Sequence, residues 1–172
     1  GIDEELNAAQ KVCEKFPEHQ YIKIGFESHQ ALVAQYPHMS CDQLFYKQLD
    51  VPYKYRFTKF HFVRDFKKEE EAFKLVNPTN VPYIFIHDNP EVGAVINRDT
   101  QFKVIKNDIR INIAHFGKIL ENAKEVHLME SSIRCLIEDP RLSIKGKLFY
   151  HTLRGGYHAV NSKSTRLQWE VI

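Results

Sequence analysis

Glycine is scarce in this chain, and its scarcity excludes the common glycine-rich phosphate loops. Only 7 of the 172 residues are glycine, about 4% against the roughly 7% of average usage. Neither GxGxxG nor the P-loop pattern occurs, and both need closely spaced glycines so that backbone amides can approach a phosphate. A GxSxG serine hydrolase is excluded as well, because Ser131 lacks the flanking glycines of that motif.

Paired cysteines, long apolar runs and a strong charge of one sign are also missing. Cys13, Cys41 and Cys135 are widely spaced and form no CxxC pair, so we expect free thiols in a cytoplasmic protein. The longest apolar runs cover about five residues, whereas a membrane span needs roughly 20. A net charge of +2 supplies no broad basic field, so nucleic acid is not an expected partner.

The residues that are present suffice for one folded domain. The chain is 43% hydrophobic and contains 12 phenylalanines and 8 tyrosines, which excludes intrinsic disorder. Its length matches a single domain. It begins with Gly-Ile-Asp-Glu rather than Met, so we expect a trimmed chain.

A cluster of turn residues at 77–80 divides the chain. Residues 1–80 are predicted to form a reduced or truncated lobe of helices and strands. The spacing of apolar residues predicts helices over 3–16 and 40–49, and a further helix after Asp65. Arg64 and Asp65 are interpreted as a surface ion pair combined with a helix cap. Apolar and polar residues alternate over 21–26 and 53–62, which predicts two strands.

Residues 81–172 are predicted to form an α/β, Rossmann-like three-layer domain with a mostly parallel sheet. Short apolar runs alternate with helical patterns, and this order builds parallel strands joined by right-handed crossovers. The expected strands cover residues 83–86, 102–105, 125–129 and 147–150. The expected helices cover 111–123 and a segment that follows Glu130, has Ser131 and Ser132 in its first turn and is stopped by Pro140.

Polar residues follow each of the four predicted strands. The carboxyl ends of parallel strands meet at one edge, where open α/β sheets bind their ligands. We therefore expect one crevice to be lined by His87, Asp88, Lys106, Asn107, Glu130, Ser131, Ser132, His151 and Arg154.

The sequence Glu130-Ser131-Ser132 leads from a predicted strand directly into a predicted helix. Free backbone amides and the positive end of a helix dipole favour an anion at such a junction. A diphosphate fits there, and Glu130 beside it is placed to hold ribose hydroxyls. The alternative is that Ser131 is simply a helix N-cap.

Two further pairs carry open alternatives. His87-Asp88 is interpreted as a loop pair that contacts ligand or acceptor. One alternative is a metal-binding pair of a phosphohydrolase. The other is a plain turn, since Asp88 begins the turn-forming sequence Asp-Asn-Pro. In the pair His151 and Arg154, the arginine suits bidentate contact with phosphate and the histidine suits proton transfer. The alternative is a solvated loop.

The second half resembles the nucleotide-sugar-binding lobe of GT-B glycosyltransferases, in particular fucosyltransferase-like and heptosyltransferase-like families. The resemblance covers roughly residues 81–172 and is carried by a strand ending in HD, a strand ending in KN, then EVHLMESSIRCLIED and KLFYHTLR. The strand–Glu-Ser-Ser–helix junction is its most specific part.

The resemblance implies a metal-independent transferase that moves a sugar from a nucleotide-sugar donor to a glycan or lipid acceptor. It implies that Ser131 and Ser132 hold the diphosphate, while His151 or Arg154 adds positive charge as the diphosphate leaves. His87 and Asp88 are the predicted general bases. No cofactor is implied, because the nucleotide sugar is itself a substrate.

Two other functions remain open at this stage. One is a non-catalytic binding or interaction module that retains only the fold of the lobe. The other is a metal phosphohydrolase built on His87 and Asp88. The oligomeric state is also open, a homo-oligomer included.

Overall fold

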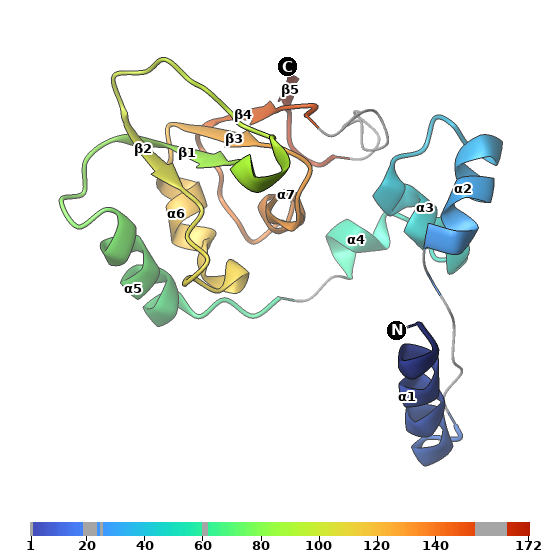
Figure 1. The fold of residues 1–172 in the computed structure, drawn as a ribbon. Coiled ribbons are helices and arrows are strands. Elements are labelled where there is room, and N and C mark those ends of the chain that lie inside the picture. The colour runs from blue at the N-terminus through green and yellow to red at the C-terminus, as the bar shows by residue number, and fades with distance from the viewer. Residues whose placement is uncertain (1, 19–23, 25, 60–61, 154–164) are drawn as a thin grey trace. The chain divides into compact units, whose positions relative to one another are not determined.

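The structure, a computed structural model, describes residues 2–18, 24, 26–59, 62–153 and 165–172. It forms two compact units, Gly1–Pro52 and Tyr53–Ile172, which Figure 1 shows in blue and in turquoise to red, respectively. The site residues predicted from the sequence all belong to the second unit.

The first unit consists of helices α1 (Ile2–Lys15), α2 (Phe26–Gln35) and α3 (Cys41–Gln48). The predicted helices over 3–16 and 40–49 are confirmed. Ser40 occupies the N-cap of α3, and its amide donates a hydrogen bond to Gln43 Oε1 at 2.9 Å. Of the strand predicted over 21–26, residues 21–23 and 25 lie outside the described residues, and Phe26 already begins α2.

The second unit has the predicted α/β, Rossmann-like fold. Its sheet is entirely parallel, with the strand order β2-β1-β3-β4-β5. The strands are β1 (Tyr83–His87), β2 (Lys103–Lys106), β3 (Glu125–Leu128), β4 (Lys147–Tyr150) and β5 (Glu170–Val171). The helices are α4 (Tyr55–Thr58), α5 (Phe66–Val76), α6 (Gly117–Asn122) and α7 (Ser132–Ile137), with 3-10 turns η1 (Pro90–Val92) and η2 (Ile113–His115).

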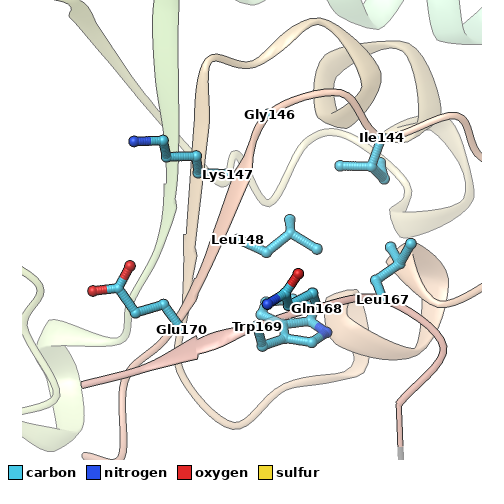
Figure 2. A pocket seen from close by; sticks show the side chains of 8 residues that line it. All are labelled: Ile144, Gly146, Lys147, Leu148, Leu167, Gln168, Trp169 and Glu170. Carbon is cyan, nitrogen blue, oxygen red and sulfur yellow. The ribbon is translucent and has the colours of Figure 1, made fainter. Parts of the chain in front are cut away.

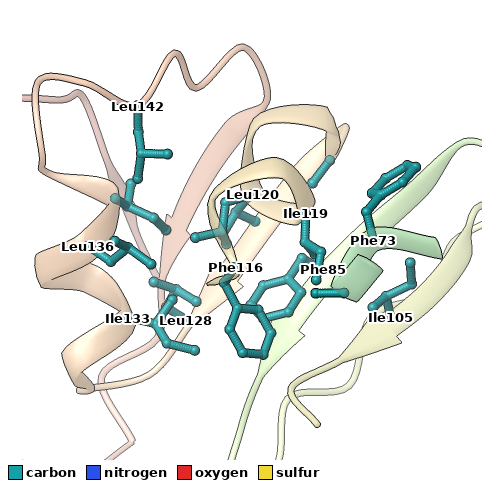
Figure 3. Close-up of a cluster of buried hydrophobic side chains, with 14 of the residues drawn as sticks. Phe73, Phe85, Ile105, Phe116, Ile119, Leu120, Leu128, Ile133, Leu136 and Leu142 are labelled. Carbon is teal, nitrogen blue, oxygen red and sulfur yellow. The ribbon is translucent and has the colours of Figure 1, made fainter. Parts of the chain in front are cut away.

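Helices α5, α6 and α7 cover one face of the sheet (Figure 1). Side chains from these helices and from the strands form the main hydrophobic core. Figure 3 shows Phe85 and Leu128 of the sheet facing Phe116, Leu120 and the leucines and isoleucines of the helices. Phe85 and Leu128 are completely buried, so the two central strands are anchored by this layer.

The opposite face is covered by the segment that joins β1 to β2. Its small cluster consists of Ile84, Ile86 and Ile96, with Phe102 packed against it. This arrangement follows from the strand order: β2 lies on one side of β1 and β3 on the other, so right-handed crossovers place their connections on opposite faces.

The second unit begins at Tyr53, whereas the sequence prediction divided the chain near residue 80. Helix α5 packs against α6, and its residues Ala72 and Phe73 belong to the main core. Asp65 caps α5 as predicted, since its carboxylate accepts a hydrogen bond from Lys68 N at 3.1 Å.

The strand predicted over 53–62 is wrong, because the segment contains the short helix α4. Tyr53 and Phe57 stack edge-to-face with their ring centroids 5.7 Å apart, and Arg56 donates to the Tyr53 hydroxyl at 2.8 Å. These contacts join residues three and four apart, which is helical spacing. Residues 60–61 lie outside the described residues.

The other differences concern where elements begin and end. The helix predicted over 111–123 is split into η2 and α6, which begins at Gly117. A Cβ at this position would lie 2.5 Å from Glu69 Oε2, so α5 and α6 approach as closely as they do only because this residue is glycine. The two-residue strand β5 was not predicted.

Candidate functional site

The strand order places a topological switch point between β1 and β3. The chain leaves β1 for β2 on one side and returns across β1 to reach β3. Open α/β sheets bind ligands outside the carboxyl ends of the strands at such a point. The candidate site is therefore the edge formed by the carboxyl ends of β1 and β3 and of their neighbours β2 and β4.

The structure brings eight of the nine predicted residues to this edge. Backbone hydrogen bonds hold the strand ends together: Met129 N donates to His87 O at 3.2 Å, and beyond β4, His151 N donates to Leu128 O at 2.8 Å. Arg154 lies outside the described residues. The residues at the edge are His87, Asp88, Lys106, Asn107, Glu130, Ser131, Ser132 and His151.

Strand alternation divides these residues between the two faces. Successive side chains of a strand point to opposite faces, so His87 follows Phe85 to the helix-covered face. Asp88 follows Ile86 to the other face, where its Oδ2 accepts a hydrogen bond from Ile96 N at 3.2 Å.

Asp88 is buried in an ion pair. Its side chain is 2% exposed, and Lys106 Nζ lies 2.8 Å from Oδ2. The same oxygen accepts the Ile96 amide. Asp88 thus positions Lys106 at the end of β2 and fixes the connection that covers this face of the sheet.

His87 is half-buried at the end of β1 and contacts Asn107. Burial lowers its pKa below the ordinary value of 6.5, although the hydrogen bond with the Asn107 side chain and the charge of Asp88 act in the opposite direction. The ring is therefore neutral at pH 7. Its Nδ1 atom is buried and makes no hydrogen bond within the part of the chain that the structure describes.

Ser131 has the backbone of an N-cap but not its hydrogen bond. Its extended backbone (φ −159°, ψ 164°) precedes α7, yet its side chain forms no cap bond. The Oγ atom is buried and has no hydrogen-bond partner among the described residues. Capping therefore does not account for this hydroxyl, while the neighbouring Ser132 is exposed.

Basic and phenolic side chains that the sequence analysis missed lie around α7. Arg134 is buried on α7. Burial, followed by the charge of Glu130, raises the pKa of the Tyr150 phenol, while Arg134 opposes this shift. Burial lowers the pKa of Arg56, whose side chain interacts with Cys135. The only signal in the sequence was the position of Arg134, two residues after Ser132.

The second missed group is a row of hydrogen-bonded side chains on the other face. His127 Nε2 lies 3.0 Å from Glu125 Oε2, and His127 Nδ1 lies 3.0 Å from His151 Nε2. His127 is 1% exposed and stacks on Phe149, with ring centroids 4.5 Å apart. Glu125 also accepts from Arg98 Nε at 3.1 Å. The signal was the alternation of Glu125 and His127 along one strand.

Two cavities of about 530 Å³ each lie in the second unit. One follows the edge strand β2 and includes Lys106 and Asn107 of the predicted set. The other lies at the amino end of β4 beside Trp169 (Figure 2) and contains none of that set. Only the first cavity thus adjoins the candidate site.

The described residues contain no group of three or more His, Cys, Asp or Glu side chains placed to hold a metal ion. The phosphohydrolase alternative for His87 and Asp88 therefore gains no support from them. No helix in the described ranges combines the length and apolar character that a membrane crossing requires.

Acid is expected to destabilise the protein through its buried histidines. Burial is the main reason why the pKa values of His87, His127 and His151 lie below 6.5. As the pH falls below 6.5, the unfolded chain binds protons that the folded chain does not, so stability present above this pH is lost as the pH falls through the lowered pKa values. Urea unfolding followed by the fluorescence of Trp169 at pH 7.5 and pH 5.5 measures this loss.

The matched variants are His127→Phe and His38→Gln. The first removes a buried titrating ring and is expected to reduce the loss of stability between the two pH values. The second replaces an exposed histidine of the first unit and is expected to leave that loss unchanged. Equal acid sensitivity in the wild type and in His127→Phe would contradict this assignment.

Comparisons with protein-family models, with curated proteins and with solved structures return no match for this chain. Function is therefore inferred from the residues of the chain and their geometry alone.

Proposed function

We propose that the second unit binds a nucleoside diphosphate sugar at the carboxyl edge of β1 and β3, and that the protein is a GT-B-like glycosyltransferase. The observation that carries the proposal is the pair of buried polar atoms at the switch point, His87 Nδ1 and Ser131 Oγ, which find no partner among the described residues. A buried polar atom without a hydrogen bond costs about 1–3 kcal/mol. A ligand that bonds to both atoms would recover this cost.

The surrounding charges suit a diphosphate. Lys106 is held at the edge by Asp88, and Arg134 lies buried on α7, two residues after Ser132. We assign to these cations and hydroxyls the neutralisation of the leaving diphosphate, which in this proposal requires no metal ion. Glu130 is assigned to the ribose hydroxyls.

The proposed reaction transfers the sugar to a glycan or lipid hydroxyl. The acceptor oxygen forms a bond to the anomeric carbon, the bond from that carbon to the diphosphate breaks, and the diphosphate leaves with the electron pair. The hydroxyl proton must pass to a base. His87 and Asp88 were predicted for this step, but the burial of Asp88 in its pair with Lys106 favours a positioning role for it.

Nucleotide binding tests the proposal. The chain is titrated with a panel of nucleoside diphosphates, and the shift in unfolding temperature is recorded. At 100 times Kd, a ligand stabilises the native state by about 2.7 kcal/mol. The double variant Ser131→Ala/Ser132→Ala is expected to weaken binding about 30-fold, because two hydrogen bonds of about 1 kcal/mol each are lost.

The control variant is Ser143→Ala, which removes an exposed hydroxyl between α7 and β4 and is expected to bind as the wild type does. A wild-type chain that binds no member of the panel would overturn the proposal. So would a double variant with undiminished affinity.

A non-catalytic binding module is the second candidate. This candidate is favoured because two of the predicted catalytic side chains are already occupied by contacts within the chain. Asp88 contacts Lys106, and His87 contacts Asn107. Binding of a nucleotide sugar without any release of nucleoside diphosphate would select this candidate over the transferase.

A further inference from the structure

A continuous row of polar side chains crosses the face of the sheet opposite the helices. Arg98 donates to Glu125, Glu125 bonds to His127, and His127 bonds to His151. From Arg98 the row enters the sheet at Glu125, the first residue of β3, and it ends at His151, just beyond β4 at the carboxyl edge. It therefore connects the interior of the sheet with the candidate site.

The hydrogen bonds determine where the protons lie in this row. Burial raises the pKa of Glu125, but the hydrogen bonds from His127 and Arg98 more than offset this effect, so its pKa is lowered. An ionised carboxylate only accepts, so His127 Nε2 carries the proton. Its Nδ1 is then an acceptor, and His151 Nε2 must donate to it. His151 Nδ1 is left with a lone pair.

The row is also rigid. His127 is almost fully buried and lies parallel to the ring of Phe149, with an interplanar angle of 7°. Arg98, which donates to Glu125, also lies over the Phe149 ring, with its Cζ 5.7 Å from the ring centroid. A base held by packed, hydrogen-bonded neighbours loses little freedom when it reacts.

We propose that His151 is the catalytic base of the transfer reaction and that Glu125 and His127 are its positioning residues; this inference rests on the proposed function. As the acceptor oxygen bonds to the anomeric carbon, its proton moves to His151 Nδ1, and the diphosphate leaves with the electrons of the broken bond. The positive charge that forms on His151 is stabilised through His127 by the carboxylate of Glu125.

The charges that face His151 keep it neutral before the reaction. Its pKa is lowered by burial first, and then by the charges of His127 on β3 and Arg98 on the segment after β1. Directly after β1, the charged residue of this face is Asp88, which is paired with Lys106. Turnover is therefore expected to rise with pH along a limb centred below 6.5 and to level off above it.

Two measurements on the full chain test the assignment without a substrate. Two-dimensional ¹H–¹⁵N NMR spectra of the histidine rings, recorded with ¹⁵N-labelled protein, are expected to show that His151 is protonated at Nε2 and unprotonated at Nδ1. Diethyl pyrocarbonate is expected to modify His151 above pH 6.5 and to do so severalfold more slowly in His127→Phe. A proton on Nδ1, or an unreactive His151, would overturn the proposal.

Turnover is measured as release of nucleoside diphosphate from a panel of nucleotide sugars. His151→Asn is expected to lower kcat by about 10²–10⁴-fold while nucleoside diphosphate binding stays unchanged. Glu125→Gln is expected to lower kcat less than His151→Asn does and to move the acid limb of the pH–rate profile. Glu125→Asp keeps the carboxylate and is expected to be faster than Glu125→Gln. His38→Gln is the control with wild-type kcat.

The outcomes separate this inference from the proposed function. A wild-type rate in His151→Asn, with nucleotide binding intact, would overturn the role of His151 alone. If the wild type binds a nucleotide sugar but releases no nucleoside diphosphate, the catalytic role of His151 is overturned as well. If no nucleotide binds although the spectra and the chemical modification agree with expectation, the proposed function is wrong and the role of His151 in the transfer falls with it, while the proton positions assigned to the row stand.

Discussion

Replacement of Arg64 by methionine is expected to lower the free energy of unfolding by about 3–5 kcal/mol, because it leaves a buried carboxylate without its partner. Arg64 Nε donates to Glu69 Oε1 at 2.8 Å, and its terminal nitrogens bond to Glu69 and Glu121. The Glu69 side chain is 1% exposed and that of Arg64 is 9% exposed. The sequence analysis had assigned Arg64 to a surface pair with Asp65, which is wrong.

Glu69 cannot turn towards water when its partner is lost. The α-carbon of Gly117, at the start of α6, lies against its carboxylate so closely that a Cβ would approach to 2.5 Å. Glu121 is better placed, since it also accepts a hydrogen bond from Ser143 N at 2.8 Å. Most of the destabilisation is therefore assigned to the stranded charge of Glu69.

Urea unfolding, followed by circular dichroism and by the fluorescence of Trp169, measures the effect. The control Lys68→Met removes an exposed pair with Asp65, and such pairs contribute little, so its urea midpoint is expected to match the wild type. The double variant Arg64→Met/Glu69→Met is expected to be more stable than Arg64→Met, since it removes the stranded charge. A single variant that loses less than about 1 kcal/mol would contradict the assignment.

Replacement of Glu138 by glutamine is expected to release the C-terminal segment from α7. Glu138 is 1% exposed. Its Oε2 accepts hydrogen bonds from Arg166 N at 2.5 Å and Leu167 N at 3.2 Å, and its Oε1 accepts from Trp169 Nε1 at 2.6 Å. A glutamine offers only one acceptor oxygen, so its amide group would face N–H donors. We expect a loss of about 3 kcal/mol.

The Arg166 guanidinium strengthens the same connection from the other side. It donates to the carbonyl oxygens of Ile137, Glu138 and Asp139 at 3.3, 2.9 and 3.0 Å, which lie at the end of α7, where backbone acceptors are unpaired. Strand β5 follows directly, and it is only two residues long. Its position beside β4 therefore depends on this contact more than on its own backbone pairing.

The single tryptophan of the chain reports this change directly. Trp169 is half-buried and stacks edge-to-face with Tyr150, at 6.2 Å between ring centroids. Its emission is expected to shift to longer wavelength in Glu138→Gln, as the ring gains contact with water, and to stay unchanged in the control Glu170→Gln, an exposed neighbour. An unaltered spectrum and urea midpoint in Glu138→Gln would contradict the proposed anchoring.

Most regular elements of the second unit were predictable because their signals are local. β1 is an apolar run that ends in polar residues, and α5 starts at an Asp that caps it. The segment over 53–62 misled the prediction, because alternating aromatic and basic residues also fit the three- and four-residue contacts of α4. β5 was not predicted because its pairing depends on the hydrogen bonds that Arg166 and Trp169 donate to Glu138, about thirty residues away in the chain.

The candidate site was predictable only as a set of residues at one edge. The alternation of strands and helices implies a parallel sheet, and in a parallel sheet the carboxyl ends of the strands lie at one edge. Which atoms lack partners was not predictable: Asp88 is buried against Lys106, while Ser131 leaves its hydroxyl without a cap bond. The His127–His151 contact depends on the register between β3 and β4.

The sequence by itself thus determined the α/β class, the positions of β1 to β4 and the edge at which polar residues gather. It excluded glycine-rich phosphate loops, and the site that the structure offers is built from side chains instead. Only the tertiary structure decided that Arg64 lies between Glu69 and Glu121 and that Glu125, His127 and His151 form one row. The reason is physical: periodicity records contacts within a segment, whereas burial and strand register arise between residues far apart in the chain.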